Sequence, residues 1–272
     1  MTRLEIGLST CPNDTFLFAP LLDRRVDTRG LDLRFRLGDI QELNESLAKR
    51  ELEVSKASFA AALQLAEHYG VLRVGSALGF GVGPVLLGRP GAVAGQLPED
   101  AVVLCPGEAT TATLLMRCLH AELTHIEHRR FDEIMPALVA GEADAGVCIH
   151  EGRFTYRDHD LLLLEDLGDR WEKETGQPVP LGGLLCRLDV PLEVVGRLQD
   201  VLSDSLAQAR AEPEACLPTM RRYAQELSDE VIWRHVELYV NDQTSDLGIT
   251  GRRCLDELAR RAGVYGPLVV FD

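Results

Sequence analysis

Apolar and polar residues alternate with a period of two in two segments near the N-terminus, residues 4–8 and 31–37. This period predicts two half-buried strands. The apolar run 16–22 between them follows a polar turn and predicts a helix. Asp14 is a suitable N-cap for that helix, and Pro20 is expected to kink or shorten it.

A helical period follows in residues 39–50, where apolar positions recur every three to four residues. A polar turn at residues 55–58 then leads into an alanine-rich helix that ends at Gly70. Further strands are predicted at residues 71–74 and 82–87. The first third of the chain therefore alternates strands with helices.

Residues 88–98 are rich in glycine and proline and predict a linker, beyond which the alternation restarts. The pattern predicts strands at residues 101–105, 124–128 and 145–149, and helices at residues 110–120 and 133–140. From Pro191 the pattern is helical as far as Ala262. Alternation at this spacing is typical of βαβ units and mostly parallel sheets.

The predicted fold class is α/β, with two lobes and a central cleft. The large lobe is expected to comprise residues 1–89 and 183–272, including the C-terminal helices. Residues 90–182 are expected to form a small inserted lobe. A strand at residues 181–187 would lead the chain back to the large lobe.

The net charge excludes one class of partner. The 272 residues carry 28 basic and 43 acidic side chains, a formal net charge of −15. Binding to nucleic acid needs a basic surface that neutralises phosphates, so no nucleic-acid partner is expected. The apolar runs are far shorter than the roughly 20 residues that span a bilayer, so no membrane partner is expected.

The N-terminus enters the first strand without the basic segment and apolar stretch of a secretory signal. We therefore expect a cytoplasmic protein. Its seven cysteines are an odd number and include no Cys-x-x-Cys pair, which argues against a disulfide framework. A homodimer is expected only because two-fold dimers are the commonest soluble oligomers.

Four polar segments follow predicted strands or precede predicted helices. They are residues 9–14, 55–58, 107–111 and 150–152. In open α/β sheets ligands bind at the carboxyl ends of strands, where helix N-termini present unpaired N–H groups. We therefore expect these segments to meet at one edge of the cleft and to bind a small anionic molecule that carries a carboxylate.

Thr110 and Thr111 begin a predicted helix, and their hydroxyl groups suit a carboxylate or carbonyl oxygen. Ordinary helix capping explains a threonine at this position equally well. Lys56 stands between Ser55 and Ser58 and adds a positive charge to a similar turn. A solvated lysine on a surface loop is the alternative explanation.

His150 stands at the predicted end of the strand at residues 145–149. An imidazole there could exchange a proton at neutral pH, and Glu151 or a backbone carbonyl could orient it. A hydrogen-bonded structural histidine is the commoner explanation of a lone histidine. Asp14 is a second candidate acid or base, although capping alone would explain it.

Cys118, His120, His125 and His128 lie within eleven residues and are the candidate ligands for a metal site. His125 and His128 face opposite sides of a strand, and the ligand spacing is irregular, so no metal site is expected. Cys11 lies near the start of a helix and could be a reactive thiol, but the sequence shows no partner base for it.

Five motifs stand in order along the chain: Ser9-Thr10-Cys11-Pro12-Asn13-Asp14-Thr15-Phe16, Ser55-Lys56-Ala57-Ser58-Phe59-Ala60-Ala61, Gly79-Phe80-Gly81-Val82-Gly83-Pro84, Gly107-x-x-Thr110-Thr111-Ala112 and Ile149-His150-Glu151-Gly152-Arg153-Phe154-Thr155-Tyr156. Together they resemble the 1,4-dihydroxy-6-naphthoate synthase family of the futalosine pathway of menaquinone biosynthesis. The likeness covers nearly the whole chain in length and motif order.

The resemblance implies a two-lobed fold like that of type II periplasmic binding proteins. It also implies a carbon–carbon lyase that converts cyclic dehypoxanthine futalosine into 1,4-dihydroxy-6-naphthoate without a metal or organic cofactor. The proposed base of the family matches His150. The substrate contacts of the family match Lys56, Ala57, Ser58, Thr110 and Thr111. Asn13 and Asp14 are candidate contacts to sugar hydroxyl groups.

Three other functions remain open. Chorismate dehydratase, an enzyme of the same pathway, is thought to share the fold and would act on another substrate. A non-catalytic small-molecule binding protein of the same fold is the rival from a different class, although the missing export signal argues against an exported one. A metal-dependent hydrolase would require bound zinc.

Overall fold

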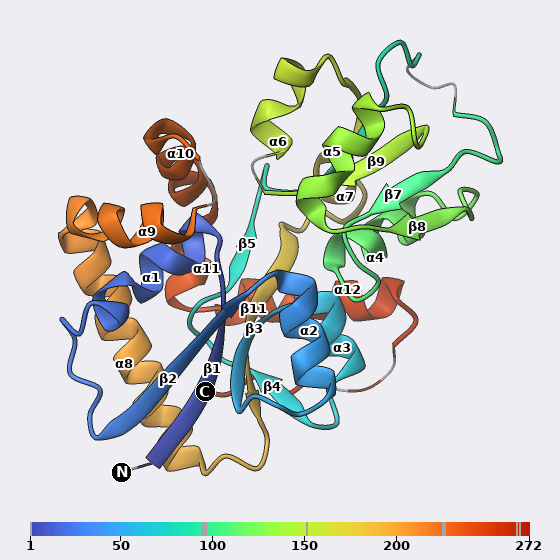
Figure 1. The fold of residues 1–272 in the computed structure, drawn as a ribbon. Helices are drawn as coiled ribbons and strands as arrows, with labels where there is room; N and C mark the ends of the chain where they lie inside the picture. The colour runs from blue at the N-terminus through green and yellow to red at the C-terminus, as the bar shows by residue number, and fades with distance from the viewer. Residues whose placement is uncertain (1, 94–96, 151, 225–226, 265, 267) are drawn as a thin grey trace.

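The two alternating segments near the N-terminus are neighbouring parallel strands of one sheet. β1 (Thr2–Ser9) pairs with β2 (Leu31–Gly38) along its whole length. The computed structural model describes residues 2–93, 97–150, 152–224, 227–264, 266 and 268–272. Within these residues the strands form two separate sheets, each of which is the centre of one lobe (Figure 1).

The first sheet has the strand order β2-β1-β3-β11-β4, and β5 also pairs with β11. The remaining strands of this sheet are β3 (Val54–Ser58), β4 (Tyr69–Val71), β5 (Ala77–Gly79) and β11 (Val179–Arg187). Apolar side chains fill both faces of the sheet. One core packs against α1 and α8, and the other packs against α2, α3 and α12. We call this part of the molecule the first lobe.

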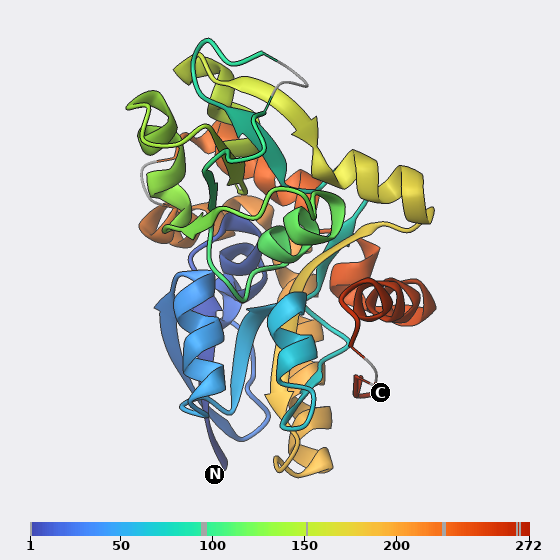
Figure 2. The same cartoon turned by 90° about the vertical axis from the view of Figure 1, so that its right-hand side faces the viewer.

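Most helices of the first lobe come from the two ends of the chain. They are α1 (Pro12–Leu22), α2 (Ile40–Ala48), α3 (Phe59–Gln64), α8 (Leu192–Ala211), α9 (Leu217–Tyr223), α10 (Asp229–Tyr239), α11 (Asp242–Ser245) and α12 (Gly248–Arg261), with a 3-10 turn at Pro213–Cys216. Asp39 caps α2 through a capping box with Glu42, which explains where that helix begins. Both termini also lie on this lobe (Figures 1 and 2).

The second sheet has the strand order β10-β6-β9-β7-β8. Its strands are β6 (Val85–Gly88), β7 (Val103–Cys105), β8 (Ile126–His128), β9 (Ala145–Cys148) and β10 (Leu162–Asp166). Its helices are α4 (Thr111–Leu119), α5 (Phe131–Val139), α6 (Gly152–Thr155) and α7 (Leu167–Thr175), with a 3-10 turn at Tyr156–His159. This second lobe also has an apolar core on each face of its sheet.

The α/β class is confirmed, but the prediction of mostly parallel sheets is wrong. β11 runs antiparallel to its three partners, and β6 runs antiparallel to β9 and β10. The return strand therefore enters the middle of the first sheet in the opposite direction. β6 belongs to the second sheet although it precedes the predicted lobe boundary at residue 89. The lobe limits 1–89, 90–182 and 183–272 stay predictions.

Two local predictions are also wrong. Asp14 does not cap α1, because Cys11 is the N-cap residue and Asp14 lies buried in the first turn of the helix. Residues 55–58 are not a turn, because they form most of the buried strand β3. Polar residues can occupy a central strand here because their side chains find buried partners, described below. The helix α1 continues to Leu22, two residues beyond Pro20.

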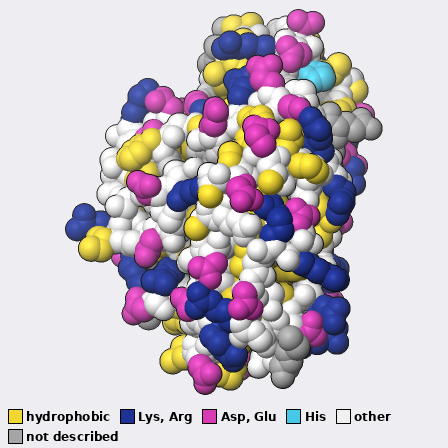
Figure 3. Space-filling view, turned by 90° about the vertical axis from the view of Figure 1, so that its left-hand side faces the viewer, with side chains coloured by type: hydrophobic (Ala, Val, Ile, Leu, Met, Phe, Trp, Pro, Cys, Tyr) yellow, Lys and Arg dark blue, Asp and Glu magenta, His cyan; other side chains and the backbone are white. Residues whose placement is uncertain are grey.

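Charged side chains of both signs are interspersed on the face drawn in Figure 3, where no continuous basic area gathers. Across the described part of the chain, no helix combines the length and apolar character needed to cross a membrane.

Candidate functional site

A cavity between the two lobes collects residues from both sheets. Its wall consists of Ser9, Cys11, Asn13, Asp14, Ile40, Lys56, Ala57, Ser58, Ala77, Val82, Gly83, Pro84, Thr110, Ile149, His150, Leu181, Gly182, His235 and Tyr239. All four polar segments singled out in the sequence reach this one cavity.

His150 follows β9 and enters the cavity from the second lobe. Its backbone is in the left-handed region, with φ of 54°, a conformation that costs a residue other than glycine on the order of 1 kcal/mol. Strain of this kind clusters at functional sites, although Arg24, Arg29, Arg50 and Asp160 share the conformation in this chain. The ring of Phe131 packs edge-on against the imidazole, with 4.9 Å between ring centres. Glu151, its predicted orienting partner, lies outside the described residues.

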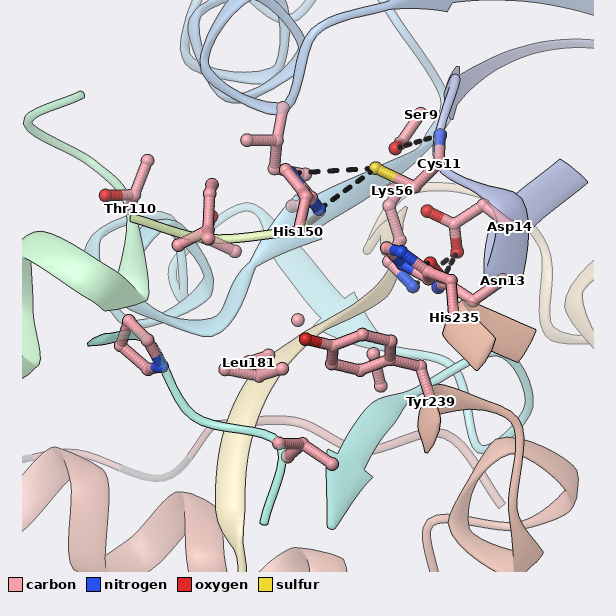
Figure 4. Close-up of a pocket in the computed structure, with 18 of the residues that line it drawn as sticks. Ser9, Cys11, Asn13, Asp14, Lys56, Thr110, His150, Leu181, His235 and Tyr239 are labelled. Atoms are coloured by element: carbon pink, nitrogen blue, oxygen red, sulfur yellow. Dashed lines mark hydrogen bonds and ion pairs between the residues drawn. The ribbon is translucent and has the colours of Figure 1, made fainter. Parts of the chain in front are cut away.

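The side chain of Cys11 faces His150 from the first lobe (Figure 4). Its Sγ lies 3.3 Å from Nδ1 and 3.6 Å from Nε2 of the imidazole. Cys11 begins α1, and its backbone N–H donates to the hydroxyl of Ser9. The sequence showed no base near this thiol because His150 is 139 residues away along the chain. The lobes thus meet through a thiol and an imidazole.

Lys56 and Asp14 form a buried ion pair beside the cavity. The Lys56 Nζ lies 2.6 Å from Asp14 Oδ1 and also donates to the carbonyl of Gly75 at 3.0 Å. The exposed fractions of the two side chains are only 5% and 8%, so the alternative of a solvated lysine is wrong. Burial raises the pKa of Asp14 above its ordinary value, and the ammonium of Lys56 opposes this rise.

Thr110 lies on the cavity wall and caps α4, and its hydroxyl accepts from the N–H of Thr113 and donates to the carbonyl of Gly107 at 2.8 Å. Thr111 is not part of that wall. Its hydroxyl instead links the lobes, donating to the carbonyl of Leu181 at 2.7 Å and accepting from the N–H of Ala60 at 3.2 Å. The capping function of Thr110 is confirmed, and ligand binding by both threonines stays a prediction.

Ser58 lies on the same face of β3 as Lys56 and also lines the cavity. The side chain of Asn44 holds it in place, since its oxygen accepts from the Ser58 N–H and its amide donates to the Ser58 hydroxyl. The same amide reaches the carbonyl of Ala109 in the second lobe at 3.3 Å. Ser58 and the start of α4 are therefore held near one another.

His235 on α10 is a cavity residue that the sequence analysis missed. It is 1% exposed, and its Nε2 lies 3.1 Å from Asn13 Oδ1. Its ring stacks near that of His150, with centres 6.0 Å apart, and contacts Tyr239. Burial, together with the charges of His150 and Lys56, holds the pKa of His235 well below its ordinary value. The sequence offered one indication that His235 is buried. It lies on the same apolar face of α10 as Ile232, Val236 and Tyr239.

The histidines considered as metal ligands, His120, His125 and His128, do not line this cavity. His120 pairs with Glu122 and Glu165, and His125 is exposed. Among the residues that the structure describes, no three His, Cys, Asp or Glu side chains are grouped so as to hold a metal ion.

Two α/β lobes with a cavity between them are the architecture of a periplasmic-binding-protein-like fold. The structure of the alkanesulfonate-binding protein SsuA from Xanthomonas axonopodis pv. citri matches with a TM-score of 0.67 at 14% identity, over 100% of this chain and 96% of that one. A protein from Archaeoglobus fulgidus matches with a TM-score of 0.88 at 30% identity, over 96% and 97% of the two chains. The fold predicted from the resemblance is confirmed.

The chain belongs to the menaquinone biosynthesis family, whose model matches residues 4–263. A Thermus thermophilus protein named 1,4-dihydroxy-6-naphtoate synthase is 41% identical over 266 residues, 98% of this chain and 96% of that protein. A Streptomyces coelicolor protein with the same name is 38% identical, over 97% and 94% of the two chains. These findings confirm the family predicted from the five motifs.

Proposed function

We propose that this protein converts cyclic dehypoxanthine futalosine into 1,4-dihydroxy-6-naphthoate, with His150 as the general base. Two relatives that carry the synthase name and cover nearly the whole chain support the choice of reaction. The observation that carries the proposal is the position of His150, whose imidazole lines the cavity between the lobes and faces the thiol of Cys11 from the other lobe.

In this proposal the imidazole takes a proton from a carbon next to a carbonyl group. The electron pair of the broken C–H bond forms an enolate. As the enolate collapses, the carbon–carbon bond to the sugar-derived part breaks, the electron pair of that bond leaves with the sugar-derived part, and the proton held by His150 is returned to it. Formation of the aromatic ring drives the step. Because the cavity lies between the lobes, closure over the substrate would exclude water from these charged intermediates.

The carboxylate of the substrate would bind at the other end of the cavity, at the start of α4. Thr110 lines the cavity there, and the first N–H groups of this nine-residue helix favour a negative charge. Ser58 supplies a hydroxyl group. The reaction as proposed is a carbon–carbon lyase reaction that uses neither a metal nor an organic cofactor.

The direct test is to incubate the purified protein with cyclic dehypoxanthine futalosine and to detect the naphthoate by chromatography and absorbance. We expect release by the wild-type protein, and turnover lower by a factor on the order of 10²–10⁴ in His150→Ala, as for the loss of a general base. His125→Ala is the matched control, because that exposed histidine lies outside the cavity. Near-normal turnover by His150→Ala would eliminate the proposed base, and binding without release would favour a non-catalytic binding protein.

A further inference from the structure

One nitrogen of His235 is a buried polar atom with no hydrogen-bond partner among the described residues. This atom is Nδ1, and the imidazole that carries it belongs to the cavity wall. A buried polar group without a partner costs on the order of 1–3 kcal/mol, so its presence at a cavity calls for an explanation. The reaction proposed above assigns His235 no part.

The neighbours of His235 fix which nitrogen carries the proton. The amide nitrogen of Asn13 donates to Asp14 Oδ1 at 3.0 Å, because an ionised carboxylate only accepts hydrogen bonds. The Oδ1 of Asn13 therefore faces His235, and it can only accept. Nε2 of His235 must carry the proton that it donates to Asn13.

Nδ1 is consequently a hydrogen-bond acceptor. Burial and the nearby positive charges hold the pKa of His235 well below its ordinary value, so that the ring stays neutral at physiological pH. A neutral acceptor at a cavity wall selects a ligand that offers an O–H or N–H donor, and it cannot bind a carboxylate. The complementary group on the ligand is therefore a donor.

We propose that Nδ1 of His235 accepts a hydrogen bond from a hydroxyl group in the sugar-derived part of the substrate. This inference rests on the proposed function. It follows from the layout of the cavity, in which Thr110 and His235 lie on opposite sides of His150 (Figure 4). With the carboxylate bound at Thr110, the substrate extends past His150, and the portion farthest from the carboxylate meets His235.

Two variants separate this role from a structural one. In His235→Gln the side-chain amide nitrogen can replace Nε2 and donate to Asn13, but the acceptor at the position of Nδ1 is lost. In His235→Asn the amide oxygen can replace Nδ1, but the contact with Asn13 is lost. The two substitutions therefore remove opposite halves of the same imidazole.

Binding is measured by calorimetry in the His150→Ala protein, which prevents turnover, with cyclic dehypoxanthine futalosine and with 1,4-dihydroxy-6-naphthoate. The naphthoate lacks the sugar-derived part and is the control ligand. We expect His235→Gln to weaken binding of the substrate about 10- to 100-fold, the usual effect of losing one buried hydrogen bond. Binding of the naphthoate should stay within about threefold, and His235→Asn should bind the substrate better than His235→Gln. The kcat/KM of the same variants with His150 intact should follow this order.

Normal substrate binding by His235→Gln with weak binding by His235→Asn would overturn the inference, because His235 would then act only through Asn13. Equal weakening for both ligands would overturn it as well. If the wild-type protein binds the substrate but releases no naphthoate, the proposed function fails alone, and the comparison of variants still decides the role of His235. If the substrate does not bind even to the wild-type protein, both fail.

Discussion

The buried ion pair between Lys56 and Asp14 makes the sharpest prediction about stability. Replacing Lys56 with Met removes the ammonium and leaves a carboxylate that is 8% exposed without its cation. The substitution also removes the hydrogen-bond donor to the carbonyl of Gly75. Losing one member of a buried pair costs about 3–5 kcal/mol, so we expect Lys56→Met to lose about that much free energy of unfolding at pH 7.

The loss of unfolding free energy in Lys56→Met should increase as the pH rises. Folding raises the pKa of Asp14 above the ordinary 3.8, and removing Lys56 removes the charge that opposes the rise. The folded variant therefore binds a proton more tightly than its unfolded chain does. Its stability falls as pH rises from 3.8 towards the raised folded value. The difference from the wild-type protein should be largest near neutral pH and should shrink as the pH is lowered.

Urea unfolding followed by circular dichroism at pH 5 and pH 7 measures both effects, and thermal unfolding should show a decrease of roughly 6–20 °C in Tm at pH 7. The double variant Lys56→Met with Asp14→Asn is the control. It removes both charges together and should recover to within about 2 kcal/mol of the wild-type protein. A loss below about 1 kcal/mol in the single variant, or a double variant no more stable than the single one, would refute the reasoning.

Two further predictions concern a thiol and a glycine. Iodoacetamide at pH 8 should label Cys11 at least about tenfold faster than Cys105, because Cys11 is half-buried beside the cavity while burial raises the pKa of Cys105 to about 12. Mass spectrometry measures the labelling, and turnover should fall in step with modification of Cys11; full activity after complete modification would contradict its place in the site. Gly83→Ala should lower the free energy of unfolding by about 3 kcal/mol or more, because the added Cβ would lie 2.2 Å from the Cα of Gly168, which is backbone and cannot move aside. Gly196→Ala, where a Cβ meets nothing within 4 Å, is the control for the melting experiment, and equal stability of the two variants would contradict the close approach.

Strong local patterns predicted the fold well. The alternation of residues 4–8 and 31–37 identified β1 and β2, and the helical period of residues 39–50 identified α2. These elements present one apolar face to a core, and such a face is visible in the sequence itself. The direction of β11 was not predictable in this way, because the pairing of distant strands leaves no local signal.

Residues 55–58 show what local patterns cannot reveal. Their polarity is typical of a turn, yet Lys56 and Ser58 occupy a buried strand because Asp14 and Asn44 satisfy their polar groups. Those partners lie 42 and 14 residues away along the chain. A polar residue in a buried strand becomes recognisable only when its partner is known, and the prediction failed for this reason.

The residues of the candidate site likewise fall into those that local motifs reveal and those that depend on a distant partner. The motifs of the resemblance indicated His150 and most of the polar wall, since they are short runs that can be recognised directly. His235 escaped notice because its significance depends on Asn13, which is 222 residues away. Its position on a helix that otherwise shows an ordinary amphipathic pattern gave little reason to single it out.

The pairing of Val85 with Asp166 has a consequence for how the molecule can move. The first strand of the second sheet in chain order thus lies beside its last strand, and α7 then leads the chain on to β11 of the first sheet. A rotation about this junction would turn the second lobe as a rigid body without breaking a hydrogen bond of either sheet. Since His150 lies on one lobe and Cys11 on the other, such a rotation would separate the imidazole from the thiol and widen the cavity between them.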